Sequence, residues 1–424
     1  MRVFKNKIFN NAVFTFIVIT FLFGRSFVGI YIFGFRLGEL LALLSFLGTT
    51  LLVVKNTELI DFYGKKIIFS CYLILVSFLI SFTLSNSIIT DTYTFKSSSY
   101  LWAISWLFFG YFYFKNSNFK RVHIIILNFS LIYLYVLSTV NYPNLFITFF
   151  KNYSDKWDFN KASSLMLCFI IVILLNNKLS LLKNYSLDFF LLASALYLPL
   201  ILYKSRGSFI ALFLFIFLQI FEYRKILFKR VKRYVPTICL SIIVLITSSL
   251  NVVNVGVEEL LSSEFGIFGS SGVVEKLAGQ KDTKVDAFFS FYSRDNRIFS
   301  TDGNINWRIQ IWQDVIFDLK DQEKTLYGYG YKDIIPAMTV DERKGRDGLN
   351  EHVHNFLVNI FARGGTLQLI IFILFYYFLT SKTKNITVFS YILPLLVVSF
   401  FDASMENAHF PILFYFFLPV FMKE

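Results

Sequence analysis

The chain is short of charged residues and of cysteines, and each shortage excludes a class of protein. Charged residues make up 16% of its 424 residues and hydrophobic residues 56%, whereas soluble domains carry about 25% charged residues. A soluble globular protein is therefore excluded. The three cysteines, Cys71, Cys168 and Cys239, all fall inside or at the edge of apolar segments. They form neither a disulfide framework nor a zinc-binding spacing.

The apolar residues gather in segments of about 15–20 residues, the length that crosses a hydrocarbon core of about 30 Å. Inside a bilayer every backbone polar group must be satisfied within its own segment, so these segments are predicted to be helices. No strict alternation of apolar and polar residues indicates a β-barrel. The sequence predicts an all-α integral membrane protein, a polytopic bundle of about 12 transmembrane helices. We place the spans near 8–23, 37–54, 66–84, 99–114, 122–140, 162–176, 186–203, 207–222, 235–250, 355–380, 386–401 and 409–422.

The basic residues lie unevenly at the two ends of these spans. With the N-terminus in the cytoplasm, 20 Lys and Arg lie on the cytoplasmic side and 8 in the short loops on the other side. This asymmetry follows the positive-inside rule and orients the chain with both termini in the cytoplasm. The basic cluster from Arg224 to Arg233 is then an anchor near anionic lipid, so we expect membrane lipids and no nucleic acid among the partners.

One long polar stretch divides the chain into three predicted parts. Residues 1–250 form an N-terminal membrane bundle of about nine spans, 251–353 a large periplasmic loop containing short helices, and 354–424 a C-terminal membrane bundle of about three spans. The first span resembles a signal sequence, but no small-residue cleavage site follows it, so we expect it to be retained. Inside the loop, apolar residues recur at 305, 309, 312, 316 and 319. That spacing predicts a helix, which Asp302 or Asn304 would cap.

A basic residue stands between two apolar segments in the Ser-Arg-Gly-Ser sequence at 205–208. The predicted orientation places Arg206 at the external membrane boundary, in a tight hairpin between helices. Ser205 and the backbone N–H groups of a helix N-terminus would form an anion site there, and Lys204 would add a positive charge. Arg308, in the loop helix, is a second candidate cation. The alternatives are a snorkelling side chain for Arg206 and a solvated charge for Arg308.

Three of the four histidines, His352, His354 and His409, are predicted on the external side. His354, followed by Asn355, stands at the start of an apolar helix. Imidazole is a suitable general base for a sugar hydroxyl near neutral pH. The alternative for His354 is a structural role at the helix start.

The Gly328-x-Gly330 sequence lets the backbone come close to another group, such as a sugar or a phosphate. The alternative is a simple turn, and the absence of a βαβ context argues against a dinucleotide site. No carboxylate cluster suggests a metal, so we expect neither metal nor cofactor. Asp402 and Glu406 fall on the external side, but their separation is unknown from sequence, so a pair of the glycosidase type is not assigned.

Taken in order, these motifs resemble the O-antigen ligase/polymerase superfamily between about residues 200 and 370. The chain departs from the family pattern at Gln368, where a second glycine often follows Gly364-Gly365. The motifs are Ser205 to Ser208 opening a span, Trp307-Arg308 in a long external loop, Gly328 and Gly330, His354-Asn355, and Ala362-Arg363-Gly364-Gly365.

The resemblance implies a GT-C-like membrane glycosyltransferase that uses an undecaprenyl-pyrophosphate-linked glycan at the periplasmic face of the bacterial inner membrane. By that resemblance Arg206 and Arg308 would hold the pyrophosphate, and His354 would activate the acceptor hydroxyl. The donor is already activated, so the implied reaction requires neither a nucleotide nor a metal. The residues expected to contact substrate are Lys204, Ser205, Gly328, Gly330 and Asn355.

The acceptor distinguishes the functions that stay open. An O-antigen ligase would attach the glycan to lipid A-core, and an O-antigen polymerase would attach it to another glycan. A protein oligosaccharyltransferase is a third member of the same class. The rival from another class is a transporter or lipid-glycan flippase, which should show inverted repeats or charges at mid-membrane. The sequence shows no repeat and its mid-span segments are nearly free of charge, which favours an enzyme.

Overall fold

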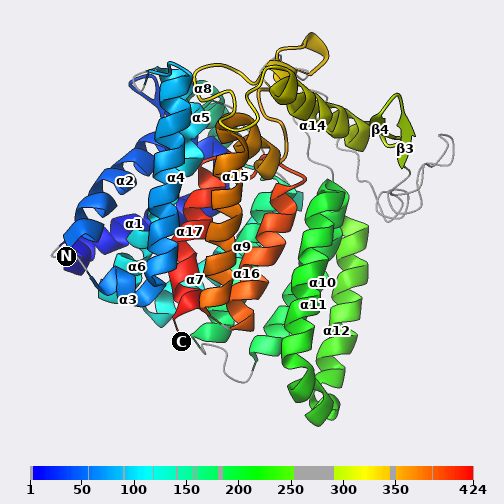
Figure 1. The fold of residues 1–424 in the computed structure, drawn as a ribbon. Helices are drawn as coiled ribbons and strands as arrows, with labels where there is room; N and C mark the ends of the chain where they lie inside the picture. The colour runs from blue at the N-terminus through cyan, green and yellow to red at the C-terminus, as the bar shows by residue number, and fades with distance from the viewer. Residues whose placement is uncertain are drawn as a thin grey trace.

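A computed structural model gives the fold, a bundle of apolar helices with a polar cap at one end (Figure 1). The chain is a polytopic helical membrane protein. Among the described residues, six helices are long and apolar enough to cross a membrane, and four shorter apolar helices accompany them. The structure describes residues 3–55, 57–88, 91–117, 119–139, 142–155, 157, 160–179, 185–252, 291–343, 350–383 and 385–423.

The bundle is built in chain order from two groups of helices around the polar loop. The first group is α1 (Lys7–Val28), α2 (Leu37–Lys55), α3 (Glu58–Tyr63), α4 (Lys65–Leu84), α5 (Thr92–Trp102), α6 (Ser105–Asn116), α7 (Arg121–Thr139), α8 (Asn144–Tyr153), α9 (Ala162–Lys178), α10 (Ser186–Lys204), α11 (Arg206–Lys229) and α12 (Val231–Asn251). The second group is α15 (Phe356–Lys382), α16 (Ile386–Ser399) and α17 (His409–Met422). The short 3₁₀ helix η1 (Val3–Lys5) precedes α1, and the hairpin β1 (Tyr31–Ile32) and β2 (Phe35–Arg36) joins α1 to α2.

A helix covers most of every predicted span, and one span is broken. The segment predicted at 99–114 is two helices, α5 and α6. Between them, the N–H groups of Trp106 and Leu107 bond three residues back, to the carbonyls of Ala103 and Ile104. The Trp102 ring packs edge-on against aromatic rings of α2 and α4. Hydropathy does not record such packing, so the break was not predicted. Among the described residues, six helices are both long and apolar enough to cross a membrane, so the count of twelve stays a prediction.

The described part of the polar loop folds against one end of the bundle. It contains the hairpin β3 (Phe291–Arg294) and β4 (Arg297–Ser300), the helix α14 (Gly303–Asp321), and the 3₁₀ helices η2 (Pro336–Met338) and η3 (Asp341–Arg343). The predicted loop helix is α14, and Asp302 caps it by accepting from the Ile305 N–H at 3.0 Å. The stretch at 258–279 lies outside the described residues.

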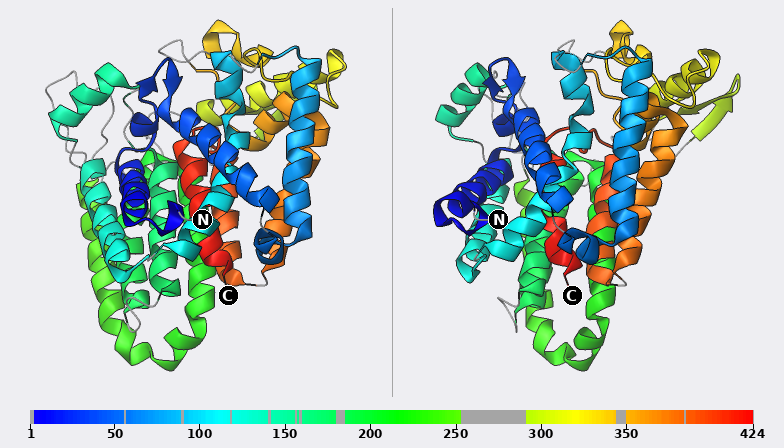
Figure 2. Two further views of the ribbon diagram at one scale, coloured as in Figure 1. Left: turned by 90° about the vertical axis from the view of Figure 1, so that its left-hand side faces the viewer. Right: turned by 60° about the vertical axis from the view of Figure 1, so that its left-hand side comes forward.

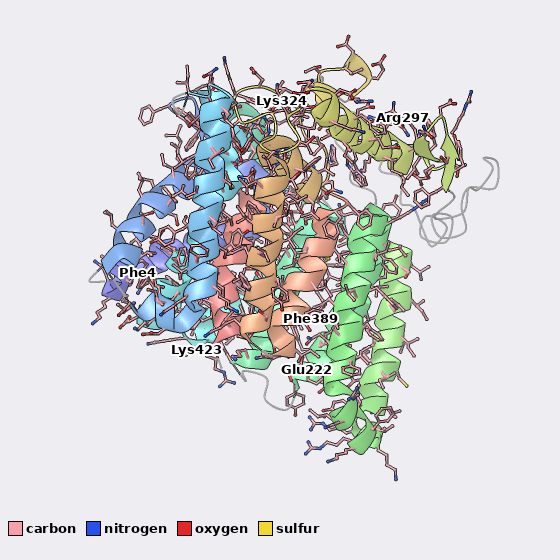
Figure 3. The ribbon with its side chains drawn as sticks, in the orientation of Figure 1. Phe4, Glu222, Arg297, Lys324, Phe389 and Lys423 are labelled. Atoms are coloured by element: carbon pink, nitrogen blue, oxygen red, sulfur yellow. The ribbon has the colours of Figure 1, made fainter. Side chains whose placement is uncertain are left out.

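The polar cap and the basic cluster lie at opposite ends of the molecule. The views in Figure 2 place α14 above one end of the bundle, and the turn between α11 and α12 at the other. Figure 3 places Arg297 and Lys324 with the cap, and Glu222 and Lys423 toward the opposite end. This arrangement agrees with the segregation of charge from which the orientation was predicted.

The loop segment 325–330 forms hydrogen bonds with α15 that replace some of the bonds within that helix. Gly365 is non-helical (φ +67°), so the N–H groups that follow it cannot reach the carbonyls one turn earlier. Both sets of groups bond to segment 325–330 instead, which leaves none of them unsatisfied. The bonds run from Thr366 N–H to Thr325 C=O (2.9 Å), Leu367 N–H to Leu326 C=O (3.4 Å), Tyr329 N–H to Ala362 C=O (2.7 Å) and Gly330 N–H to Arg363 C=O (2.9 Å).

Gly328→Ala should lower the apparent Tm of the purified protein in detergent, without substrate present. A Cβ at Gly328 would lie 2.6 Å from the carbonyl oxygens of Ala362 and Arg363, and the backbone there has φ +72°. We expect a loss of about 1–3 kcal/mol of stability from the strained conformation. The control is Gly48→Ala in α2, where no atom lies within 4 Å of an added Cβ. An unchanged Tm for Gly328→Ala would contradict the packing role of this glycine.

Candidate active site

A cavity of about 350 Å³ lies where the starts of α11 and α14 meet the loop after α16. It is lined by four of the predicted site residues, although about one hundred positions separate Arg206 from Arg308 in sequence. The fold therefore brings together two cations that come from different helices. We call this cavity the arginine pocket and define it by Lys204, Ser205, Arg206, Asp302, Arg308 and Phe401.

Arg206 is the first residue of α11, and Ser205 caps that helix. The Ser205 hydroxyl accepts from the Ser208 N–H at 3.4 Å. The Arg206 guanidinium forms an ion pair with Asp302 (3.0 Å), and its side chain is 37% exposed. Asp302 also caps α14, so this one carboxylate joins the starts of the two helices that carry the arginines. A guanidinium at a helix N-terminus is well placed to bind an anion, because the helix dipole and the N–H donors favour negative charge there.

Arg308 lies deeper than Arg206. Its guanidinium donates to the backbone carbonyl of Phe401, in the loop between α16 and α17. Burial lowers the pKa of Arg308, and the carboxylates of Asp402 and Asp302 oppose that effect. Since an unperturbed arginine titrates near 12.5 or above, Arg308 stays charged near neutral pH. The loop after α16 thereby fixes the position of the second cation.

His354 stands just before α15 in a left-handed backbone conformation (φ +54°). Its ring packs edge-on against Trp307 of α14, with ring centroids 5.2 Å apart. Burial lowers the pKa of His354 to about 3, and the charge of Arg308 acts in the same direction. The imidazole is therefore neutral near pH 7. Positive φ in a residue with a side chain is uncommon and is found at functional sites.

Asn350 sets the tautomer of His354. The Asn350 Oδ1 accepts the His352 N–H (3.4 Å) and lies 3.2 Å from the His354 Nε2. Because Oδ1 is an acceptor, Nε2 carries the proton and Nδ1 has the lone pair. The Nδ1 atom is buried and has no hydrogen-bond partner within the described structure. The ring thus presents one unused proton acceptor.

Asp402 adds a carboxylate beside this histidine. Burial raises its pKa, but Lys161, the Ser163 hydroxyl (2.5 Å) and His354 together hold the pKa below its usual value. Asp402 is therefore ionised near neutral pH. Its charge opposes the other influences on His354 by favouring the protonated ring.

His354 and the other predicted residues are not among those that line the arginine pocket. Asn355 caps α15, where its Oδ1 accepts from the N–H groups of Leu357 (3.0 Å) and Val358 (3.2 Å). Gly328 and Gly330 pack the loop against α15, so the group that their backbone approaches closely is another stretch of protein. Contact of these three residues with substrate stays a prediction. Gln368, the departure from the family pattern, is buried and accepts a hydrogen bond from the Tyr331 hydroxyl (2.8 Å).

Sequence reasoning missed the roles of Asp302 and Asp402. Asp302 was recognised only as a helix cap, and Asp402 only as a carboxylate on the external side. No local signal pairs either with an arginine, because the partners are about one hundred residues away. Across the described ranges, no three His, Cys, Asp or Glu side chains come together as metal ligands. Independence from metal stays a prediction.

Comparison of the sequence with known protein families gives a match over the part of the chain that contains this site. A family model described as O-antigen ligase matches residues 189–373. The match spans α10 to the middle of α15, and it includes both arginines of the pocket and His354. No curated protein matches the chain.

Proposed function

We propose that this chain, whose residues 189–373 form a domain of the O-antigen ligase family, is a membrane glycosyltransferase. In this proposal it transfers a glycan from undecaprenyl pyrophosphate to an acceptor at the periplasmic face of the bacterial inner membrane. One observation carries the proposal: Arg206 and Arg308 line a single cavity close to a neutral histidine with an unused nitrogen. The family supplies the substrate class, a lipid-linked glycan.

The pyrophosphate of the donor would occupy the arginine pocket. Among the described residues that line it, Lys204, Arg206 and Arg308 carry positive charge and Asp302 carries negative charge, and Asp402 also acts on Arg308. Negative charge develops on the pyrophosphate as it leaves the sugar, and fixed guanidinium donors stabilise it. The ion pair with Asp302 holds Arg206 in place before the donor binds, so little reorganisation is required.

His354 would accept the proton of the attacking hydroxyl at Nδ1. The acceptor oxygen forms its bond to the anomeric carbon while the bond from that carbon to the pyrophosphate oxygen breaks. The proton passes to His354, and undecaprenyl pyrophosphate leaves as the anion. Asp402 favours the protonated ring, so it would stabilise the imidazolium formed in this step.

Among the acceptors, we propose lipid A-core, which makes the chain an O-antigen ligase. The test reconstitutes the purified protein in liposomes with undecaprenyl-pyrophosphate-linked glycan and lipid A-core. Glycan attached to lipid A-core is the expected product, and adding EDTA should leave its rate unchanged. Longer lipid-linked glycan would identify a polymerase, and glycan on an added acceptor peptide an oligosaccharyltransferase. Movement of the donor across the bilayer without a new covalent bond would overturn the proposal in favour of a transporter.

A further inference from the structure

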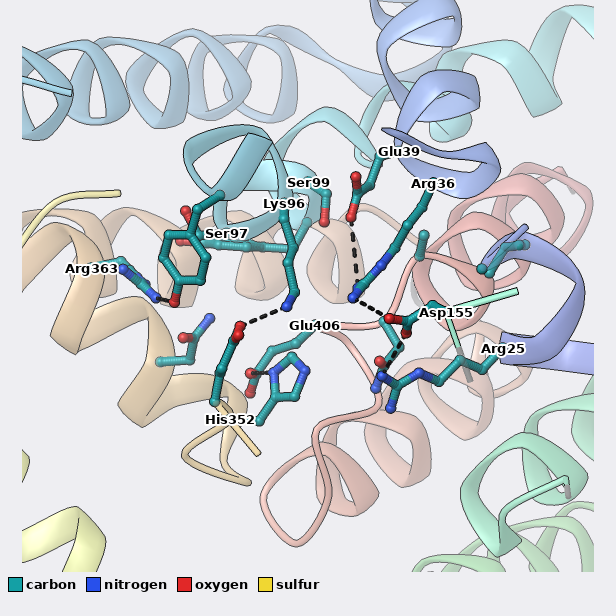
Figure 4. Close-up of a pocket in the computed structure, with 18 residues that line it drawn as sticks. Arg25, Arg36, Glu39, Lys96, Ser97, Ser99, Asp155, His352, Arg363 and Glu406 are labelled. Carbon is teal, nitrogen blue, oxygen red and sulfur yellow. Dashed lines mark hydrogen bonds and ion pairs between the residues drawn. The ribbon is translucent and has the colours of Figure 1, made fainter. Parts of the chain in front are cut away.

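A second cavity, of about 50 Å³, lies between the ends of α1, α2 and α5 and the loop before α17 (Figure 4). We call it the charged pocket and define it by six of the ionisable residues that line it. Five of the six lie outside the segment that matches the family model. They are Arg25, Arg36, Lys96, Asp155, Glu351 and Glu406.

Three of the cations that line the charged pocket form ion pairs, and a fourth, Arg363, donates to the carbonyls of Gly330 and Asp333 and to the Tyr93 hydroxyl. Asp155 pairs with Arg25 (3.0 Å) and with Arg36 (2.7 Å). Lys96 pairs with Glu351 at 2.6 Å. Figure 4 shows both sets of ion pairs on the wall of the pocket. Each of these cations is already bonded to protein groups, and Glu39, Asp155 and Glu351 bring negative charge to the same lining, which disfavours a second pyrophosphate here.

Glu406 is the group in this pocket whose hydrogen bonding is incomplete. Its side chain is 5% exposed, and its Oε2 lies 2.6 Å from the Nδ1 of His352. Its Oε1 is buried with no partner within the described structure. Burial raises the pKa of Glu406 to about 8 and lowers that of His352 to about 3, so both are uncharged near pH 7. The Ser99 hydroxyl and the Asn359 amide line the same pocket.

Neighbouring residues of the same chain segments line the charged pocket and the arginine pocket. The loop between α16 and α17 lines the arginine pocket with Phe401 and the charged pocket with Glu406. In the loop before α15, His352 also lines the charged pocket. Two residues later, His354 is close enough to Arg308 for that charge to lower its pKa. His354 thus lies on the segment between the two pockets.

We propose that the charged pocket binds the acceptor. The part bound is the hydroxyl-bearing edge of one sugar ring at the end of the acceptor glycan. This inference rests on the proposed function. Uncharged donors and acceptors from Ser99, Asn359 and Glu406 suit hydroxyl groups, and a buried oxygen without a partner loses free energy until a ligand satisfies it. In an inverting displacement the hydroxyl attacks from the face opposite the leaving group. His352 in the charged pocket is two residues from His354, which feels the charge of Arg308, so an acceptor bound in this pocket would approach the donor from the side of His352.

The test measures KM separately for donor and acceptor in the reconstituted enzyme. The probes are undecaprenyl-pyrophosphate-linked glycan as donor and, as acceptor, lipid A-core or a short lipid-linked glycan, whichever the wild type uses. Asn359→Ala and Glu406→Ala should each raise the acceptor KM by about tenfold, with the donor KM within about twofold of wild type. Glu406→Gln keeps an uncharged hydrogen-bonding group and should restore most of the acceptor affinity. Glu342→Ala, an exposed glutamate of η3, is the matched control and should change neither constant.

Three outcomes overturn the inference in distinguishable ways. If Asn359→Ala and Glu406→Ala leave both the acceptor KM and the donor KM unchanged, the pocket has a structural role only. A raised donor KM with an unchanged acceptor KM assigns the pocket to the donor glycan. If the wild type transfers glycan to neither acceptor, the proposed function fails and the acceptor site with it. If the wild type transfers glycan but the variants keep the wild-type acceptor KM, only the acceptor site is rejected and the proposed function stands.

Discussion

His354→Ala should insert and fold normally and yet transfer glycan roughly 10²–10⁴-fold more slowly, the usual contribution of a general base. The expectation rests on an imidazole that is neutral near pH 7 and whose Nδ1 has no partner among the residues that the structure describes. The measurement is transfer of glycan from purified lipid-linked donor in liposomes. His123→Ala, at the start of α7 and away from both pockets, is the matched control. A wild-type rate from His354→Ala would remove the base from the mechanism.

The pH dependence gives a second, independent sign of the same role. Without donor the pKa of His354 is lowered to about 3, so kcat/KM for the donor, which reports the free enzyme, should stay level as the pH falls from 8 to 5. Bound pyrophosphate adds negative charge nearby and should raise this pKa, because an anion favours the protonated ring. The acid limb of kcat should therefore lie at higher pH than that of kcat/KM. Coincident limbs would contradict a base that senses the donor.

Arg206→Ala and Arg308→Ala should each lower transfer by about 100-fold or more, the usual loss for one donor that stabilises developing charge. Arg206→Lys and Arg308→Lys should recover only part of that loss, since an ammonium does not reproduce the two parallel bonds of a guanidinium. The assay is the same reconstituted transfer, with protein amounts matched in the membrane. Arg308→Ala also loses the bond to the Phe401 carbonyl, so its Tm has to be measured beside its rate.

Arg294→Ala is the matched control for these variants. Arg294 lies in the same polar loop, in β3, with its side chain 78% exposed. We expect it to transfer at the wild-type rate. Normal transfer by well-folded Arg206→Ala would return that residue to the snorkelling role that its position at a helix end also fits.

The helices were predictable from sequence because their signal is local. Apolar segments of span length, and the spacing that marks α14 with Asp302 at its cap, depend on neighbours within a few turns. Arg206 and Arg308 were predicted as candidates by their types and by the resemblance. Their meeting in one cavity was implied by the resemblance only, since no local pattern joins residues one hundred positions apart.

Features that depend on packing between distant segments were not predictable. The break between α5 and α6 accompanies the packing of Trp102 against rings of α2 and α4. The charged pocket joins Arg25 and Lys96 to Glu406, which come from three remote parts of the chain. Each of these residues, taken alone, is an ordinary flanking charge of a membrane helix. Only the fold turns them into one site.

The hydrogen bonds between segment 325–330 and the break in α15 set where related proteins can exchange parts. Suppose that residues 251–353 are replaced by the loop of a related protein. The new loop would then have to bond to the carbonyl and N–H groups around Gly365, which belong to α15 of the original chain. Those groups would face an apolar surrounding without their bonds, and such a hybrid should fail to assemble. A graft that continues past Leu367 carries both halves of the contact, and the family match, which extends to residue 373, includes both halves as well.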